Sequence, residues 1–233
     1  MKTQKEIVMS LGGSLISLEE GINIRFLSEF NLFIRKFIQK GYFFNIVVGG
    51  GRICRHYLEA VKAVCPKNIP TSVLDSMAIK ATILNASLVR TVLWDVSFEE
   101  AIENYEKIPK TDKPVLVGGG WKPGSSTDFD AVLLAEKKGI KEIINLTNTD
   151  FVYSDNPQTN PEAKPLKEIS WISYRRLIGS SWISGMNTPF DPVASQKAEE
   201  LKLIVKIVNG RNLLNLEKCL LGKNFIGTTI GSI

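Results

Sequence analysis

The sequence predicts an α/β protein: a three-layer α/β/α sandwich with a mainly parallel central sheet. Short, almost continuously apolar runs alternate with segments whose apolar residues recur at helical spacing. Strands that are apolar on both faces are typical of parallel sheets covered by helices on both sides. Glycine-rich turns follow three of these runs, as they do at the carboxyl edge of open parallel sheets. We expect one domain over residues 1–233, formed by two closely joined lobes at about 1–140 and about 141–233.

The elements of the first half follow from the hydrophobic pattern. Phe26, Phe30, Phe33 and Phe37 lie on one helical face, and Gly41 is a natural helix stop. The predicted elements are a strand at 8–11, a helix at 24–38, a strand at 43–48, helices at 52–64 and about 75–92, and a strand at 114–117.

The second half continues the alternation. A helix at 128–138, a strand at 143–146, a helix at about 192–201, a strand at 203–208, a helix at about 213–221 and a final edge strand at 225–230 are predicted. Residues 155–167 are rich in Pro and Asn, which favours an ordered functional loop over a domain linker.

Composition excludes several classes of protein. The net charge is +5, but Lys and Arg do not cluster with aromatic residues, so we expect no nucleic-acid partner. No apolar run approaches the length of a membrane span. The three cysteines are far apart and form no Cys-x-x-Cys pair, which favours a reducing, cytoplasmic setting and no metal site built from Cys and His.

Three glycine turns are the first functional signal: Gly12-Gly13-Ser14, Gly49-Gly50-Gly51 and Gly118-Gly119-Gly120. Glycine lets a backbone turn its N–H groups toward an anion at close range. Three such turns at one sheet edge indicate two phosphorylated ligands that face each other, although any one turn could be purely structural. P-loop and Rossmann patterns are absent, and the only histidine, His56, has no catalytic partner in the pattern.

The order of motifs resembles the amino acid kinase superfamily, and within it the archaeal type of uridylate kinase. The matching segments are Ser10-Leu11-Gly12-Gly13-Ser14, Gly49-Gly50-Gly51 with Arg55, residues 75–79 with Arg90, residues 118–128, residues 147–157, Gly185-Met186-Asn187, and Phe190-Asp191-Pro192. The resemblance covers nearly the whole chain. It implies transfer of the ATP γ-phosphoryl group to UMP, with Mg²⁺ accompanying ATP, by a homo-oligomer that could be a hexamer.

The resemblance also implies roles for individual residues. Those expected around ATP are Gly12, Gly13, Gly51, Arg55, Thr147, Tyr153, Asp155 and Asn156. Those expected around UMP are Gly50, Asp75, Gly120, Trp121, Lys122, Pro123, Gly124, Ser125, Ser126 and Thr127. The expected catalytic positions are Ser10, Arg55 and Asp128, where Asp128 would organise the reacting phosphates through Mg²⁺ or by holding a basic side chain.

Several of these residues have a structural alternative. Asp128 could serve only the dipole of the helix that it opens, and Asp75 could be an ordinary first-turn residue. Tyr153, Trp121 and Trp182 could be packing residues rather than stacking on a base. The phenylalanine-rich helix at 24–38 could contribute to an interface or be ordinary core.

The chain departs from the family pattern at four positions. Ser10 stands where many relatives carry a lysine that neutralises the transferred phosphate, and Lys122 and Lys197 are candidates to replace it. Phe151 replaces a glycine, which would be strained if φ is positive there. Asn156 replaces an aspartate, and Gln196 a lysine. These changes keep two alternatives open: a kinase for another small acceptor, such as carbamate, a carboxylate or isopentenyl phosphate, and a nucleotide-binding or storage homologue with little catalysis.

Overall fold

A seven-stranded, mainly parallel sheet forms the centre of the protein in the computed structural model, which describes residues 5–65, 67–179 and 188–231. The strand order is β5-β4-β1-β6-β10-β11-β9. The bounds are β1 Lys5–Leu11, β4 Tyr42–Val48, β5 Val115–Gly118, β6 Glu142–Thr147, β9 Glu168–Ser170, β10 Ile204–Asn209 and β11 Thr228–Gly231. Only the pair of β10 and β11 is antiparallel within this sheet. The predicted sheet type is confirmed.

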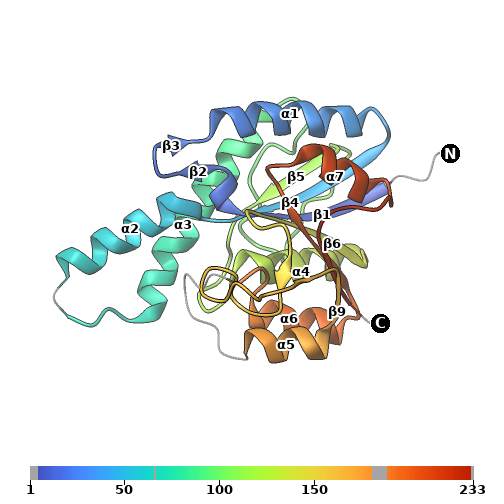
Figure 1. Cartoon of the computed structure of the whole chain (residues 1–233). Helices are drawn as coiled ribbons and strands as arrows, with labels where there is room; N and C mark the ends of the chain where they lie inside the picture. Colours follow the sequence, from blue (N-terminus) through green and yellow to red (C-terminus); the bar gives the residue numbers. More distant parts are fainter. Residues whose placement is uncertain (1–4, 66, 180–187, 232–233) are drawn as a thin grey trace.

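Helices cover both faces of the sheet (Figure 1). One face is packed by α1 (Ile24–Ile38), α7 (Leu213–Leu220) and the C-terminal half of α3 (Thr71–Val92). The other face is packed by α4 (Thr127–Lys138), α5 (Trp171–Ile178) and α6 (Pro192–Glu200). This arrangement confirms the predicted three-layer sandwich.

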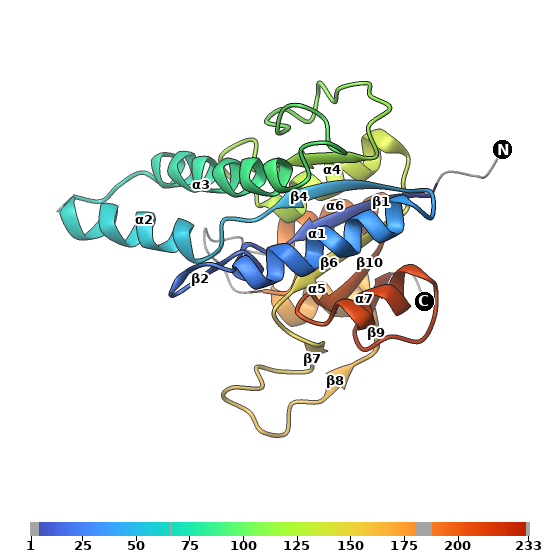
Figure 2. The ribbon, with the colours of Figure 1, turned by 90° about the horizontal axis from the view of Figure 1, so that it is seen from above.

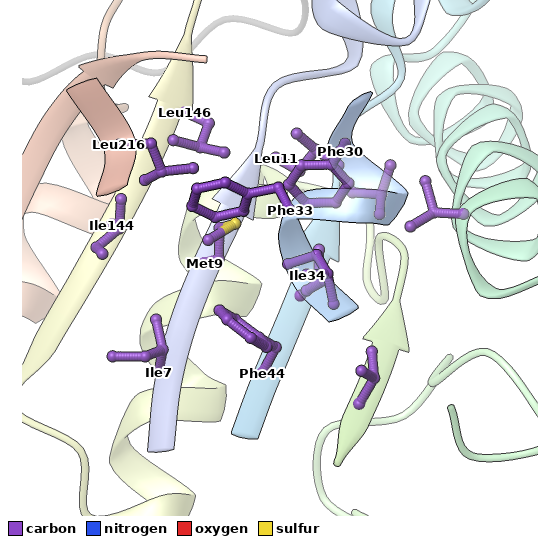
Figure 3. Close-up of a cluster of buried hydrophobic side chains, with 14 of the residues drawn as sticks. Ile7, Met9, Leu11, Phe30, Phe33, Ile34, Phe44, Ile144, Leu146 and Leu216 are labelled. Carbon is purple, nitrogen blue, oxygen red and sulfur yellow. The ribbon is translucent and has the colours of Figure 1, made fainter. Parts of the chain in front are cut away.

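The phenylalanine-rich helix α1 belongs to the core. Phe26, Phe30, Phe33 and Phe37 are all at most 7% exposed and belong to the same buried cluster as apolar side chains of β1 and β4. Figure 3 shows Phe33 beside Met9 of β1. Asn23 caps the helix by accepting a hydrogen bond from the Phe26 N–H at 3.1 Å. The alternative that these rings form an interface is therefore wrong, because the sheet already buries them.

Helix α4 is fixed at both ends. The Ser126 side chain caps its N-terminus, and Gly139 ends it in the left-handed region with φ of 68°. Its buried residues Ala131, Leu134 and Ala135 pack with apolar residues of β1, β4 and β5. The predicted small-residue face is thus the face that meets the sheet, and it places the first turn of α4 at the carboxyl edge of β1.

Helices α2 (Gly51–Val64) and α3 form a hairpin that extends beyond the sheet (Figures 1 and 2). By length and composition α3 could cross a membrane: its 18-residue window has a mean hydropathy of 1.2 and is 33% buried. In this fold, however, α3 packs on the sheet and buries the polar residues Asp75, Thr82 and Asn85.

Some boundaries and elements differ from the sequence predictions. Helix α3 begins at Thr71, directly after Pro70, which suits a helix start. The strand predicted at 225–230 is β11, and it is not an edge strand, because β9 pairs on its outer side. The elements that were not predicted are α5, β9, the hairpin of β2 (Ser17–Leu18) and β3 (Gly21–Ile22), and the hairpin of β7 (Val152–Tyr153) and β8 (Pro165–Leu166).

Candidate active site

A central cavity of about 280 Å³ lies at the carboxyl edge of the parallel strands. Residues that follow β1, β4, β5 and β6 line it together with one face of α3 and the N-terminal end of α4. Of the residues predicted from the sequence, it is lined by Ser10, Gly12, Gly13, Gly50, Asp75, Gly120, Ser125, Ser126, Thr127, Asp128 and Thr147. The topology thus gathers residues that are more than a hundred positions apart in the chain.

A side cavity of about 580 Å³ adjoins the central one. Both are lined by Thr147, Asn148, Thr188 and Pro189. The side cavity is also lined by Tyr153, Asp155 and Asn156, the other three residues that were expected around adenosine. Two adjoining cavities give room for two ligands that meet end to end.

The first two glycine turns touch each other through their backbones. A Cβ added to Gly13 would lie 2.1 Å from the Gly51 nitrogen and 2.4 Å from the Gly49 oxygen. Gly51 has φ of +63°, which a larger residue adopts only with strain. Neither turn could approach the other with side chains present, so glycine is required by packing at these positions.

The third glycine turn packs on α3. A Cβ on Gly119 would lie 2.9 Å from the Ile83 backbone, and the Gly120 N–H donates to Thr82 Oγ1 at 2.7 Å. Further along the same loop, the Gly124 N–H donates to Asp75 Oδ2 at 2.8 Å. One face of α3 therefore fixes the loop that was expected to enclose the acceptor.

Asp75 is not a first-turn residue, because α3 begins four residues earlier, at Thr71. It is 5% exposed, and its Oδ1 has no hydrogen-bond partner among the described residues. A buried carboxylate oxygen without a partner is costly unless a ligand or water supplies a donor. Because Asp75 lines the central cavity, it can accept a hydrogen bond from a bound molecule.

A pair of carboxylates lies where the N-termini of α4 and α6 meet. Ser10 Oγ donates to Asp128 Oδ1 at 2.8 Å, and the Asp191 N–H donates to Asp128 Oδ2 at 3.3 Å. Ser126, rather than Asp128, caps α4, and its hydroxyl also donates to Asp191. Asp191 in turn caps α6 through the Val193 and Ala194 N–H groups. The sequence analysis assigned no role to Asp191, although Asp-Pro before a helix is a recognisable cap.

The charges of this pair are poorly compensated. Shielding from water and the neighbouring Asp191 raise the pKa of Asp128 to about 7, against the lowering effect of the Ser10 hydroxyl. Shielding from water also raises the pKa of Asp191. Neither cavity is lined by a lysine or arginine within the described ranges. A cation delivered with a ligand would meet two oxygen-rich groups here.

The basic residues proposed from the sequence lie elsewhere. Arg55 is exposed on α2 and lines neither cavity. Lys122 lies 3.7 Å from the centre of the Trp121 ring and pairs with Glu106 at 3.4 Å. Lys197 pairs with Glu136 at 3.0 Å. None of the three lines the space beside Ser10.

The remaining predicted residues differ in their placement. Trp121 packs edge-on against Tyr105, which favours packing over base stacking, and Lys122, Pro123 and Gly124 are exposed on the loop. Gly51 lines neither cavity itself but contacts Gly13, which lines the central one. Trp182 and the Gly185-Met186-Asn187 motif lie outside the described residues.

Phe151 carries no strain, since Lys202 is the only non-glycine residue with positive φ in the described part of the chain.

Sequence reasoning missed three polar residues that shape the site. Thr82 holds Gly120, Asn145 Nδ2 donates to the Pro189 carbonyl at 2.6 Å, and Asn85 Nδ2 donates to the Gly49 and Gly50 carbonyls. Thr82 and Asn85 lie three residues apart on α3, so both point from one helical face. A polar pair at that spacing within an otherwise apolar helix was the available signal.

Hydrogen bonds connect the wall of the side cavity to strand β11. Its aromatic residues, Phe151 and Tyr153, lie edge to face with ring centres 6.3 Å apart. The hydroxyl of Thr228 on β11 accepts the Val152 N–H at 2.9 Å and donates to the Leu166 carbonyl. Thr228 thereby joins both strands of the β7–β8 hairpin to the central sheet.

Comparisons with known proteins agree with this architecture. Uridylate kinase from Methanocaldococcus jannaschii is 34% identical over 232 residues, covering 94% of this chain and 98% of that protein. Uridylate kinase from Pyrococcus abyssi is 30% identical over 227 residues, covering 96% and 98%. The crystal structure of uridylate kinase from Archaeoglobus fulgidus superposes with a TM-score of 0.79 at 30% identity, covering 97% of this chain and 100% of that one. A model of the amino acid kinase family matches residues 5–209. With this match over most of its length, the chain belongs to the amino acid kinase family.

Proposed function

We propose that this protein is a UMP kinase, which transfers the γ-phosphoryl group of ATP to UMP and releases UDP and ADP. The observation that carries the proposal is the pair of adjoining cavities, of which the central one is lined by two glycine turns and the Asp128–Asp191 pair. The similarity to uridylate kinases over almost the whole chain supports UMP as the acceptor.

In this proposal the two cavities take one nucleoside each. The side cavity, with Tyr153, Asp155 and Asn156, receives the adenosine of ATP. The central cavity receives the phosphates and UMP, with the free oxygen of Asp75 accepting a hydrogen bond from the acceptor. The acceptor lobe at about 1–140 and the ATP lobe at about 141–233 remain our prediction for how the chain divides these tasks.

The reaction needs positioning more than covalent help. An oxygen of the UMP phosphate forms a bond to the γ-phosphorus, while the bond from that phosphorus to the β,γ-bridging oxygen breaks and ADP keeps the electron pair. The acceptor oxygen is already anionic, so the step requires no strong base. Backbone N–H groups of the glycine turns and the N-termini of α2, α4 and α6 would stabilise charge on the moving phosphoryl group.

Mg²⁺ would enter with ATP. No group of three or more His, Cys, Asp or Glu side chains is arranged to hold a metal ion in the part of the chain that is described. Mg²⁺ in kinases is bound by one or two carboxylates plus substrate phosphates. Asp128 and Asp191 fit this donor set, because they are oxygen ligands whose charge no side-chain cation in the lining balances. The ion would supply charge neutralisation at the phosphates.

We also propose a homo-oligomer. Val73, Met77 and Leu84 are exposed on α3, at 54%, 36% and 54%, and a second copy could cover them. Light scattering after size exclusion tests this: a mass of one chain would contradict it. The hexamer, the cytoplasmic location and the absence of a nucleic-acid or membrane partner remain predictions.

Steady-state assays of ADP release test the main proposal. With ATP, we expect UMP to give a kcat/KM at least about 100-fold above that of CMP, carbamate, carboxylates and isopentenyl phosphate. A different preferred acceptor would support the alternative kinase reading. ATP binding by calorimetry without acceptor-dependent ADP release would support the nucleotide-binding homologue, which Ser10 and the lack of a lysine or arginine in the described cavity lining favour.

A further inference from the structure

The turn after β4 has the backbone geometry of an anion-binding nest. Gly50 has φ of −75° and ψ of −32°, in the right-handed region, and Gly51 has φ of +63°, in the left-handed region. Successive residues in these two regions turn their N–H groups toward one concave side, which binds anions. The Gly49 N–H is used by the Leu11 carbonyl at 2.9 Å. The N–H groups of Gly50 and Gly51 have no acceptor among the described residues.

A buried side chain of α3 holds this turn. Asn85 is 1% exposed, and its Nδ2 donates to the Gly49 carbonyl at 2.9 Å and to the Gly50 carbonyl at 3.0 Å. The reversed amide would place Oδ1 against two carbonyl oxygens, so only one orientation of the amide satisfies these groups. Both bonds come from one rigid amide group, and they fix two consecutive peptide planes.

Fixing the carbonyls also fixes the N–H groups. In a trans peptide the C=O and the following N–H point in opposite directions. The Gly49 carbonyl belongs to the same peptide plane as the Gly50 N–H, and the Gly50 carbonyl to that of the Gly51 N–H. With both carbonyls directed at α3, both N–H groups point away from α3. Gly13 touches the turn at both the Gly51 nitrogen and the Gly49 carbonyl, and Gly13 and Gly50 both line the central cavity.

Other contacts do not replace this restraint. The Gly50 carbonyl also accepts the Cys54 N–H, at the longer distance of 3.3 Å, but Cys54 belongs to the helix that the turn itself begins. Gly13 limits how far the turn can move but makes no hydrogen bond to these carbonyls in the described structure. Asn85 is therefore the side chain that restrains both carbonyls of the nest from outside the turn and its own helix.

We propose that Asn85 is a positioning residue, which orients the Gly50 and Gly51 N–H groups toward the phosphoryl group in transfer. The inference rests on the proposed phosphoryl transfer. Asn85 does not line the cavity, so its effect passes through the turn rather than through contact with a substrate. During transfer the phosphoryl group becomes trigonal, with its charge spread over three equatorial oxygens, so correct N–H orientation should affect kcat more than substrate binding.

Two substitutions test this role. Asn85→Leu keeps the approximate volume and removes the donors, and Asn85→Asp keeps the shape but turns acceptor oxygens toward the carbonyls. We expect kcat with ATP and UMP to fall by about 100-fold, more for Asp than for Leu, while KM for each nucleotide stays within about threefold. The matched control is Ser87→Ala, two residues further on the same helix, which should keep wild-type kinetics. A folded Asn85→Leu enzyme with wild-type kcat would overturn the proposal.

A second measurement separates this inference from the proposed function and does not need a variant that folds. Glycine-selective ¹⁵N labelling allows the amide resonances of the wild-type protein to be followed during titration with MgATP and with pyrophosphate. We expect the amide proton resonances of Gly50 and Gly51 to shift downfield when either ligand is added. The shift should be smaller in Asn85→Asp. If they respond while UMP is not phosphorylated, the kinase proposal fails and the nest role stands. If they do not respond in the wild type, the nest role fails whatever the activity.

Discussion

At the scale of single residues, Asp128 is a carboxylate whose charged form is disfavoured by its surroundings. It is held between Ser10 of β1 and the N-terminus of α6, and burial beside Asp191 raises its pKa. Asp128→Asn keeps an acceptor for the Ser10 hydroxyl but removes the charge. We expect kcat to fall by about 100- to 1000-fold with little change in melting temperature, measured by the coupled assay and by calorimetry.

The matched control for this change is Glu136→Gln, further along the same helix. Glu136 pairs with Lys197 and lines neither cavity. This variant should keep kcat, because Glu136 lies outside both cavities and a partly exposed ion pair of this kind contributes little to stability. An Asp128→Asn enzyme within threefold of the wild type would remove Asp128 from the catalytic machinery.

The raised pKa of Asp130 makes the stability of the fold depend on pH. Burial raises its pKa to about 8, although it accepts the Trp121 N–H, and Asp128 and Asp191 add to the rise. In the unfolded chain this carboxyl loses its proton near pH 4, whereas in the folded protein it keeps the proton up to about pH 8. The folded state thus binds more protons between these values, so stability falls as pH rises from about 4 to about 8 and levels off above.

Asp130→Asn should remove part of this fall in stability with rising pH. The amide oxygen can still accept the Trp121 N–H, and the group cannot ionise. We expect the free energy of unfolding to rise by about 2 kcal/mol at pH 8 and to change little at pH 4, measured by urea unfolding at both pH values. Equal effects at the two pH values would contradict the assignment of a raised pKa to Asp130.

At the scale of elements, the glycine turns behave differently from the glycines that end helices. Gly13→Ala would place a methyl group 2.1 Å from the Gly51 nitrogen, so two backbone turns must separate. We expect kcat to fall by about 100-fold or more and the protein to lose stability. Gly139→Ala meets no atom within 4 Å and strains only φ, so it should cost about 1 kcal/mol and keep kcat. Equal losses of kcat in the two variants would contradict the role of the turn.

How well each element could be predicted follows from how much apolar surface it buries. Helix α1 has six buried apolar positions at helical spacing, and its predicted range, 24–38, agrees with the structure to the residue. Strand β9 has three residues, Glu-Ile-Ser, and only Ile169 among them is buried, so it has almost no pattern. Strand β11 was predicted, but its interior position depends on β9, which pairs with it across a long stretch of sequence.

At the scale of the whole molecule, the glycine turns could be predicted to meet because parallel strands end at one edge. The carboxylate pair could not be predicted, since the contact of Asp128 with Asp191 depends on how α4 and α6 pack across the same face of the sheet. The placement of Lys122 and Lys197 depends on local partners, Glu106 and Glu136, which no motif encodes. Side-chain cations are poorly predicted because long exposed chains have many alternative partners.

The adjoining cavities predict that one linked molecule can occupy both. P1-(adenosine-5′)-P5-(uridine-5′)-pentaphosphate should compete with ATP and with UMP, because its two nucleosides fill the side and central cavities at once. We expect binding at least about 100-fold tighter than that of either nucleotide, measured by calorimetry and by inhibition patterns. Competition with only one substrate would contradict simultaneous occupancy.

Because β11 lies between β10 and β9, the stability of both neighbouring strands depends on it. Removing the chain from residue 228 onward would deprive β10 of one of its two neighbouring strands and leave β9 without its partner. It would also remove both hydrogen bonds of Thr228 to the β7–β8 hairpin. A short C-terminal truncation should therefore weaken ATP affinity as well as folding.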